Sequence, residues 1–343
     1  MIQANNRNMS LRKLLLLVLL AVVSPASASS LFDDDAVLEV KLSGPLSSLL
    51  KDKDASEELP FLLRANGIEH SIRVRLRGKS RRVVCGFPPL RIDFAAGDTA
   101  QSIFEDQDRL KLVTQCRKRD SARLDLLQEY AAYRIFNLLS EFSYKVRLLH
   151  ITYTDTEGRP GKNTFDHYGF LIESSKALAD RVGGQLVNET GLSLHSLDNK
   201  QAATVFVFQY LIGNTDWSLV RAEVDDRCCH NGDLVDIGAT RYYVPYDFDR
   251  SGLVNARYAR PDPGLRISRV TRRLYRGYCI PADALEDALG AIKARRADIL
   301  GVISQLPGLS QQAIDATIKY LEGFFVQAND ADKMLRSFER KCL

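Results

Sequence analysis

The chain has 343 residues, with 47 lysine and arginine residues against 43 aspartate and glutamate residues. A chain of this length can bury a large core, either as one two-part unit or as two domains. The nearly balanced charge argues against a general nucleic-acid-binding protein, which usually carries a clear basic excess.

Residues 1–28 have the layout of a secretory signal peptide. Arg12 and Lys13 precede an apolar run, residues 14–23, and Ala26-Ser27-Ala28 supplies the small residues that a signal peptidase accepts. The run is shorter than the ~20 apolar residues of a membrane span. We therefore expect a periplasmic or secreted protein with no membrane span once the leader is removed.

Strands dominate the first half of the sequence. Residues 70–77 alternate apolar and basic side chains, which is the period of a half-buried strand, and Gly78-Lys79-Ser80 then favours a turn. The basic cluster in residues 73–82 is expected to be a solvated face. Apolar residues on one face predict a helix over residues 121–142. Further strands are expected at residues 36–42, 91–94, 109–114, 146–154 and 168–173.

The second half is mainly helical. An apolar segment, residues 199–212, predicts a buried helix that ends at Gly213. Short strands are expected near Leu234 and at residues 241–245, with helices at residues 282–306, from Ser310 to about 328 and at the end of the chain. This order predicts an α+β fold with a sheet-rich N-lobe, residues 29–175, and a helical C-lobe, residues 176–343. A ligand cleft is expected between the two lobes.

Six cysteines remain after the leader, and an even number in an exported protein favours disulfides. The sequence does not choose among their pairings. Cys228-Cys229-His230 suggests part of a zinc site, but a second ligand pair at zinc-like spacing is missing. We therefore expect disulfides rather than zinc.

The clearest chemical pattern is the ordered set Asp216, Asn231, Asp247 and Asp249. Asp216 follows the end of the apolar helix, while Asp247 and Asp249 follow a strand-like run. Carboxylates held near the interior cost free energy unless a cation or hydrogen-bond donors satisfy them. Carboxylate and amide oxygens suit Mg²⁺ or Mn²⁺, and phosphoryl transfer uses these groups in this order. The alternative is that Asp216 caps a helix and the other two aspartates occupy a turn.

Several segments resemble the spore-coat CotH kinase family. Asn214-Thr215-Asp216 and Pro245-Tyr246-Asp247-Phe248-Asp249 are similar to its Asn-x-Asp and Pro-Trp-Asp-x-Asp elements. The matching order extends backwards from these elements. The segments that match are a turn at residues 75–80, strands at 90–94 and 109–112, a helix at 129–136 and a strand at 169–173. Lys79 stands where the family usually has Asn, and Tyr246 replaces the usual Trp.

The resemblance implies a two-lobed, protein-kinase-like fold and a nucleotide site. Lys79, Ser80 and Lys111 would contact the phosphates of ATP or another nucleotide. Glu129 would pair with Lys111, and Glu173 would lie near the adenine-binding linker. From the sequence pattern alone, Lys111 and Glu173 could equally be solvent-exposed residues. The pattern favours an exposed surface position for Glu129, which lies roughly opposite the apolar stripe of its helix.

The resemblance also implies roles for the acidic set. Asp216 would be the catalytic acid or base, Asn231 and Asp247 would bind the metal ion, and Asp249 would be an accessory metal ligand. The long segment between Asp216 and Asn231 separates this chain from the family's pattern.

The leading interpretation is metal-dependent phosphoryl transfer from a nucleotide to a protein hydroxyl. An exported enzyme does not normally meet high ATP, so a pseudokinase-like protein that binds a ligand or protein partner without catalysis is the alternative. A hydrolase is less favoured because the sequence has no Gly-x-Ser-x-Gly and no His-Glu-x-x-His motif. The scattered histidines, His230 among them, are expected to be structural or surface residues.

Overall fold

The computed structural model describes Met1 and residues 31–54, 56–189, 192–220 and 228–343. The signal peptide expected at residues 1–28 therefore falls almost entirely outside the described residues. Within the described ranges, no helix combines the length and the apolar character that crossing a membrane requires.

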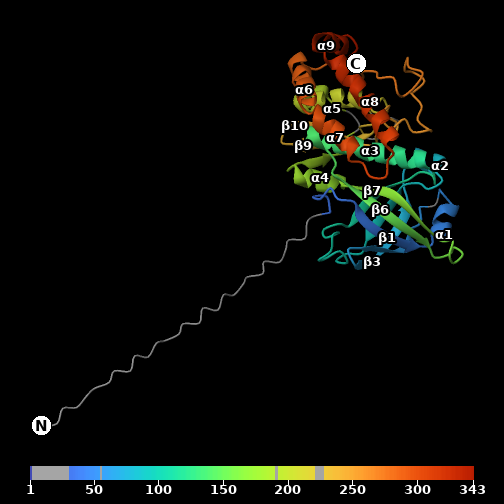
Figure 1. The fold of residues 1–343 in the computed structure, drawn as a ribbon. Coiled ribbons are helices and arrows are strands. Elements are labelled where there is room, and N and C mark those ends of the chain that lie inside the picture. The colour runs from blue at the N-terminus through green and yellow to red at the C-terminus, as the bar shows by residue number, and fades with distance from the viewer. Residues whose placement is uncertain (2–30, 55, 190–191, 221–227) are drawn as a thin grey trace.

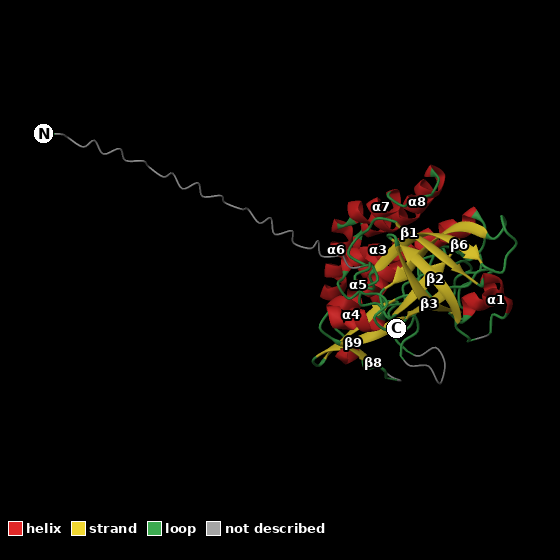
Figure 2. Ribbon diagram, turned by 90° about the horizontal axis from the view of Figure 1, so that it is seen from below, coloured by secondary structure: helices red, strands yellow, loops and turns green. Residues whose placement is uncertain are grey.

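Seven strands form a closed barrel in the first half of the chain (Figures 1 and 2). These strands are β1 (Leu38–Gly44), β2 (Leu59–Ala65), β3 (Ile68–Leu76), β4 (Leu90–Phe94), β5 (Arg109–Thr114), β6 (Val146–Asp155) and β7 (Thr164–Ile172). Parallel pairing of β1 with β6 closes the ring, and the other pairs are antiparallel. Alternate apolar residues, such as Ile72, Val74 and Leu76 of β3, are buried and fill the interior.

Three helices interrupt the barrel strands, and the remaining helices lie mostly on one side of the barrel in Figure 1. The three are α1 (Leu46–Lys51), α2 (Ser80–Val84) and α3 (Asp120–Leu139). Later elements are α4 (Ser175–Arg181), β8 (Gln185–Val187), α5 (Asn199–Ile212), β9 (Gly232–Ile237), β10 (Thr240–Pro245), α6 (Ala282–Ala294), α7 (Arg296–Ser304), α8 (Gln311–Ala328) and α9 (Ala331–Glu339). The strands β10, β9 and β8 form a second, small sheet.

Helix α3 lies between the barrel and the helical part. It contacts β6 and β7 on one side and α5 and α7 on the other. Residues all around its middle, including Leu127, Glu129, Ala131 and Tyr133, are therefore buried. A helix enclosed in this way brings polar side chains on its less apolar face into the interior, where they need partners.

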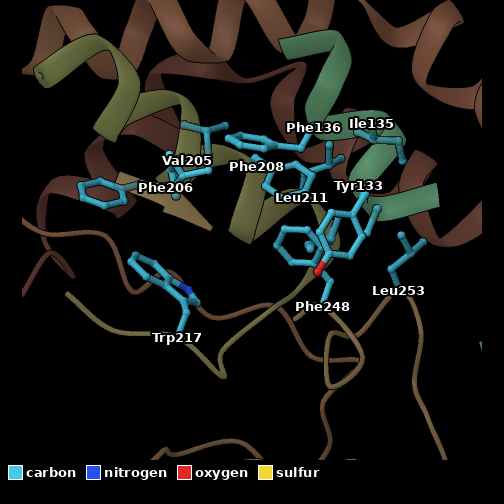
Figure 3. Packing of buried hydrophobic residues seen from close by; sticks show 14 of the residues in the cluster. Tyr133, Ile135, Phe136, Val205, Phe206, Phe208, Leu211, Trp217, Phe248 and Leu253 are labelled. Atoms are coloured by element: carbon cyan, nitrogen blue, oxygen red, sulfur yellow. The ribbon is translucent and has the colours of Figure 1, made fainter. Parts of the chain in front are cut away.

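An aromatic cluster in the helical part positions the acidic loop after β10. The buried Phe248 ring packs against Tyr133 of α3, with a centroid distance of 4.7 Å, and against Phe208 of α5, at 5.4 Å (Figure 3). Because Phe248 stands between Asp247 and Asp249, its burial holds both carboxylates at the face of α3.

The α+β composition predicted from the sequence is confirmed, with strands concentrated in the first half and helices in the second. Closure of the strands into a barrel was not predicted. The helix expected at residues 121–142 is α3, and the helix expected at residues 282–306 is two helices that meet at Arg295. A turn was expected at Gly78–Ser80. It ends at Lys79, because Ser80 is the first residue of α2.

All six cysteines form disulfides, in the pairs Cys85–Cys116, Cys228–Cys229 and Cys279–Cys342. The first pair ties the end of α2 to the segment that follows β5. The second pair uses both cysteines of the segment that suggested zinc, so neither thiol is available as a metal ligand.

Candidate functional site

A small cavity lies where the barrel, α3 and the loop after β10 meet. Its volume is about 60 Å³, which is room for a few water molecules or for one phosphate-sized group. Five of the residues predicted for the site line it, namely Lys79, Ser80, Lys111, Glu129 and Asp247. The structure therefore brings together side chains that come from a turn, a strand, a helix and a loop.

Arg81, which the sequence analysis did not single out, occupies the centre of the acidic cluster. Its side chain is buried, and its Nε donates to Asp249 Oδ2 at 2.8 Å. Its Nη2 donates to Glu129 Oε1 at 2.6 Å and to Asp247 Oδ1 at 2.8 Å. The expectation that the basic cluster is a solvated face is wrong for this residue. Arg81 is the buried residue of α2, and its contacts with three carboxylates account for its burial.

Glu129 is only 3% exposed, so the alternative that it is a surface residue is wrong. The partner that the structure records for its carboxylate is Arg81 rather than Lys111. Burial raises the pKa of Glu129, against the opposing effect of the Arg81 charge. Burial likewise raises the pKa of Asp249, whose Oδ2 also accepts a hydrogen bond from the Tyr258 hydroxyl at 2.7 Å.

Lys111 lies between two aromatic rings at the cavity. Its ammonium is 5.7 Å from the centre of the Tyr144 ring and 5.6 Å from the centre of the Tyr246 ring, distances that allow cation–π attraction. Burial and the nearby charge of Arg77 lower the pKa of Lys111. Among the residues that the structure describes, no carboxylate lies within 4.0 Å of this ammonium. Lys111 is therefore a half-buried cation at the cavity that can accept an anionic ligand.

Asp216 lies in a second group of polar residues. His230 Nε2 is 3.2 Å from Asp216 Oδ1, and Arg250 Nε is 3.7 Å from Oδ2. Asn231 Nδ2 donates to the main-chain oxygen of Asp216 at 2.6 Å and to Oδ2 at 3.2 Å. Burial acts to raise the pKa of Asp216, but His230, Arg250 and Asn231 hold that pKa below its usual range.

Local structure explains why Asp216 is held in place. Gly213 ends α5 with a φ of 64°, a conformation that glycine adopts easily, and the chain then turns into Asn214. Asn214 Oδ1 accepts the main-chain N–H of Asp216 at 3.0 Å. The next residue, Trp217, is buried and stacks on Phe206 of α5.

Asn231 links the Asp216 group to the loop that carries Asp247. Its main-chain oxygen accepts the N–H of Tyr246 at 3.0 Å, and its side chain bonds to Asp216. Asn231 and Asp247 both have positive φ values, 55° and 61°, which are uncommon for residues other than glycine and occur often at functional sites. The polar residues around Asp216 and the acidic cluster around Arg81 are therefore neighbours.

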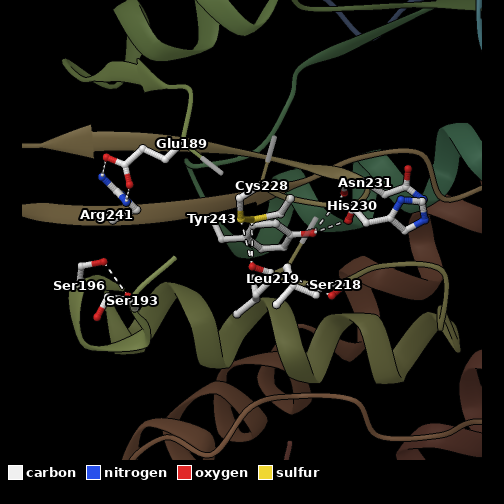
Figure 4. The surroundings of a disulfide bond; sticks show 12 residues. Glu189, Ser193, Ser196, Ser218, Leu219, Cys228, His230, Asn231, Arg241 and Tyr243 are labelled. Atoms are coloured by element: carbon white, nitrogen blue, oxygen red, sulfur yellow. Dashed lines mark hydrogen bonds and ion pairs between the residues drawn. A yellow bond between two sulfur atoms is a disulfide. The ribbon is translucent and has the colours of Figure 1, made fainter. Parts of the chain in front are cut away.

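His230 was expected to be a structural or surface residue, but it contacts Asp216. Its position in the sequence directly after Cys228-Cys229 is the signal that could have drawn attention to it. Figure 4 shows the Cys228–Cys229 disulfide beside Tyr243 and Leu219, with His230 and Asn231 following it. Cys228 Sγ lies 3.0 Å from the Leu219 oxygen, and both cysteines of the disulfide are buried.

The donors expected to bind a metal ion are already engaged by other groups of the protein. Asn231 Nδ2 faces Asp216, and Asp249 is held by Arg81 and Tyr258. In the described ranges, no group of three or more His, Cys, Asp or Glu side chains is arranged to hold a metal ion. As they are arranged, these residues do not fit Mg²⁺ or Mn²⁺.

Glu173 does not line the cavity, although the preceding residue, Ile172, does. Its carboxylate accepts hydrogen bonds from Arg181 Nε and Nη2, both at 2.9 Å, and from the main-chain N–H of Lys145 at 3.0 Å. Both carboxylate oxygens are therefore engaged, and Glu173 is buried rather than a surface acid. These contacts join the end of β7 to α4 and to the start of β6.

No family model matches the chain, and no curated protein sequence matches it. Among solved structures, the chain is similar to the Helicobacter pylori proinflammatory kinase CtkA, with 15% sequence identity. The match covers 69% of this chain and 90% of that chain, with a TM-score of 0.38.

Proposed function

We propose that the cavity binds the phosphate groups of ATP or another nucleotide and that the protein transfers a phosphoryl group to a protein hydroxyl. The observation that carries the proposal is that Lys111, Glu129 and Asp247 line one cavity although they are far apart in the sequence. The resemblance to CotH kinases implies that these three positions belong to one site. The proposal keeps the two-lobed, kinase-like arrangement as its structural basis.

The cations at the cavity suit phosphate oxygens. Lys111 and Arg77 both line it, and burial lowers the pKa of each side chain. A phosphate would add its negative charge to the attraction that Asp247 already exerts on both cations. The small volume of the cavity admits one phosphate group, and the rest of a nucleotide would lie outside it.

Asp216 is the proposed catalytic residue. Its lowered pKa keeps it ionised at neutral pH, so that it can accept a hydrogen bond from a substrate hydroxyl and orient that hydroxyl for attack. His230 and Asn231 would position it. The scheme uses no metal-dependent step, because Asp247 and Asp249 are bonded to Arg81 and Asn231 is bonded to Asp216.

Arg81 favours a second candidate function, which is ligand binding without catalysis. In a kinase-like site the carboxylates must be available to the reaction, whereas here Arg81 already engages Glu129, Asp247 and Asp249. A pseudokinase-like protein would keep the cavity and use it to bind a nucleotide or a protein partner. The three disulfides support the periplasmic or secreted location of either candidate.

Mass spectrometry of the purified protein after incubation with ATP tests the two candidates. The parent should gain a phosphate mass, and the Asp216→Asn variant should bind ATP equally well without gaining it. Asp332→Asn, an exposed position at the start of α9, is the matched control. ATP binding with no added mass would favour the non-catalytic protein. Phosphorylation retained in Asp216→Asn would contradict the role of Asp216.

A further inference from the structure

Arg81 makes three charged hydrogen bonds with two of its nitrogens. Nε bonds to Asp249, and Nη2 bonds to both Glu129 and Asp247. A guanidinium is charged at every accessible pH and has a rigid planar shape, so it matches carboxylates in a fixed direction. Removing one partner from such a buried cluster leaves an uncompensated charge. Arg81 is therefore the cation that this acidic cluster contains.

Two features fix the main chain around Arg81. Gly78 forms the turn before α2 with a φ of 89°, and the Cys85–Cys116 disulfide holds the chain directly after α2. Cys85 is itself buried, and its main-chain oxygen accepts a hydrogen bond from Lys53 Nζ at 2.6 Å. A short helix tethered at both ends keeps the guanidinium within the cluster. This argues that Arg81 is a permanent member of the site.

A divalent cation at these carboxylates would have to displace Arg81 or be added beside it. Arg77 and Lys111 line the same cavity and would repel an added cation as well. Asp247 has the most accessible of the three carboxylates, with 46% of its side chain exposed, but its Oδ1 is already bonded to Arg81. Electrostatics in the cavity thus favour an anion and disfavour a second cation.

A phosphate group can instead bind directly to protein cations. In the described part of the chain, neither Arg77 nor Lys111 has a carboxylate within 4.0 Å. Both face the cavity, where a phosphate would neutralise them without any bridging ion. The cluster around Arg81 would stay closed beneath the ligand.

We infer that Arg81 replaces the divalent cation expected of a kinase-like site, and that the cavity binds nucleotide phosphates without a metal ion. The inference rests on the proposed function, because it concerns how the same cavity binds a nucleotide. It assigns Arg81 as a positioning residue that neutralises Glu129, Asp247 and Asp249. It also assigns Arg77 as a phosphate-binding residue together with Lys111.

Isothermal titration calorimetry of the parent protein with ATP, in EDTA and then in Mg²⁺, tests the metal-free binding. The dissociation constants in the two buffers should agree within about twofold. Binding that requires Mg²⁺ would overturn the inference and leave the proposed function standing. Binding in neither buffer would overturn the proposed function. This comparison needs only the parent, so it decides the question even if variants of Arg81 fail to fold.

Titration with Mn²⁺ alone, followed by electron paramagnetic resonance, tests whether Arg81 occupies the position of a divalent cation. Arg81→Met opens the three carboxylates, so it should bind Mn²⁺ about tenfold or more tightly than the parent. Arg82→Met, the next residue of α2, is the control and should bind Mn²⁺ as the parent does. Equal Mn²⁺ affinity in the parent and in a folded Arg81→Met variant would show that Arg81 does not replace a metal ion.

Discussion

His230 Nε2 lies 3.2 Å from Asp216 Oδ1, so an imidazole faces the carboxylate of a residue 14 positions earlier. The hydrogen bond to Asp216 raises the pKa of His230, and His230 in turn lowers the pKa of Asp216. The pair contributes to folding stability in a window of pH. The contribution of Asp216 is lost as pH falls through its lowered pKa, and that of His230 is lost as pH rises through its raised pKa.

Replacing His230 by Gln should raise the pKa of Asp216, because the variant loses the hydrogen bond and the charge that stabilise the ionised carboxylate. Nuclear magnetic resonance titration of the aspartate carboxyl carbons measures this increase directly. The acidic limb of any phosphoryl-transfer activity should move to higher pH by the same amount. His195→Gln, at an exposed position, provides a control, and an unchanged Asp216 midpoint in His230→Gln would contradict the coupling.

Replacing Lys111 by Met should weaken ATP binding by about tenfold, because the apolar stem is kept while the cation at the cavity is lost. Calorimetry on the parent and the variant measures this change. Lys41→Met, at an exposed position of the barrel strand β1, is the matched control and should bind ATP as the parent does. Equal affinity in all three proteins would remove Lys111 from the phosphate site.

Replacing Gly213 by Ala should destabilise the fold by about 1–3 kcal/mol. An added Cβ would lie 2.1 Å from the Tyr320 hydroxyl oxygen, and the φ of 64° disfavours residues that have a Cβ. Gly290→Ala in α6 is the opposite case, since no atom lies within 4 Å of its added Cβ. That variant should gain about 0.5–1 kcal/mol from helix propensity. Urea unfolding of both variants gives the comparison, and equal midpoints would refute it.

Replacing Asp125 by Asn should flatten the pH dependence of stability. Burial, with a smaller effect of the Asp249 charge, raises the pKa of Asp125 to about 7. A raised pKa means that the stability contribution is complete below the unfolded value and is lost as pH rises through about 7. The parent should therefore lose about 1–3 kcal/mol more than the variant between acidic and mildly alkaline pH. Urea unfolding of both proteins at several pH values measures this difference. If the unfolding free energies of the parent and the variant change with pH by the same amount, the raised pKa is contradicted.

Local patterns predicted many elements well. The strand expected at residues 109–114 is β5, and the helix expected at residues 199–212 is α5, with the same bounds in both cases. The signals are local, since alternation defines the strand, and α5 is bounded by the Asp198 cap and by Gly213. The strand β2 was not predicted, although its burial alternates in the same way.

The sequence also indicated which distant residues belong to one site. Lys79, Ser80, Lys111, Glu129 and Asp247 do line one cavity. Local pattern could not show that α3 is enclosed on nearly all sides, and that enclosure is why Glu129 is buried and needs a cation. For the same reason it could not show that Arg81 is the cation that Glu129 contacts.

The sequence by itself determined the α+β composition, the periodicity of β5 and α5 and the order of the acidic residues, because these depend on neighbours within a few positions. The tertiary structure decided the closure of the barrel through β1 and β6, the pairing of the cysteines and the partners of Asp216. It also decided that Arg81 contacts Asp249, a residue 168 positions away. Contacts over such separations depend on burial and charge in the folded chain, which no local pattern encodes.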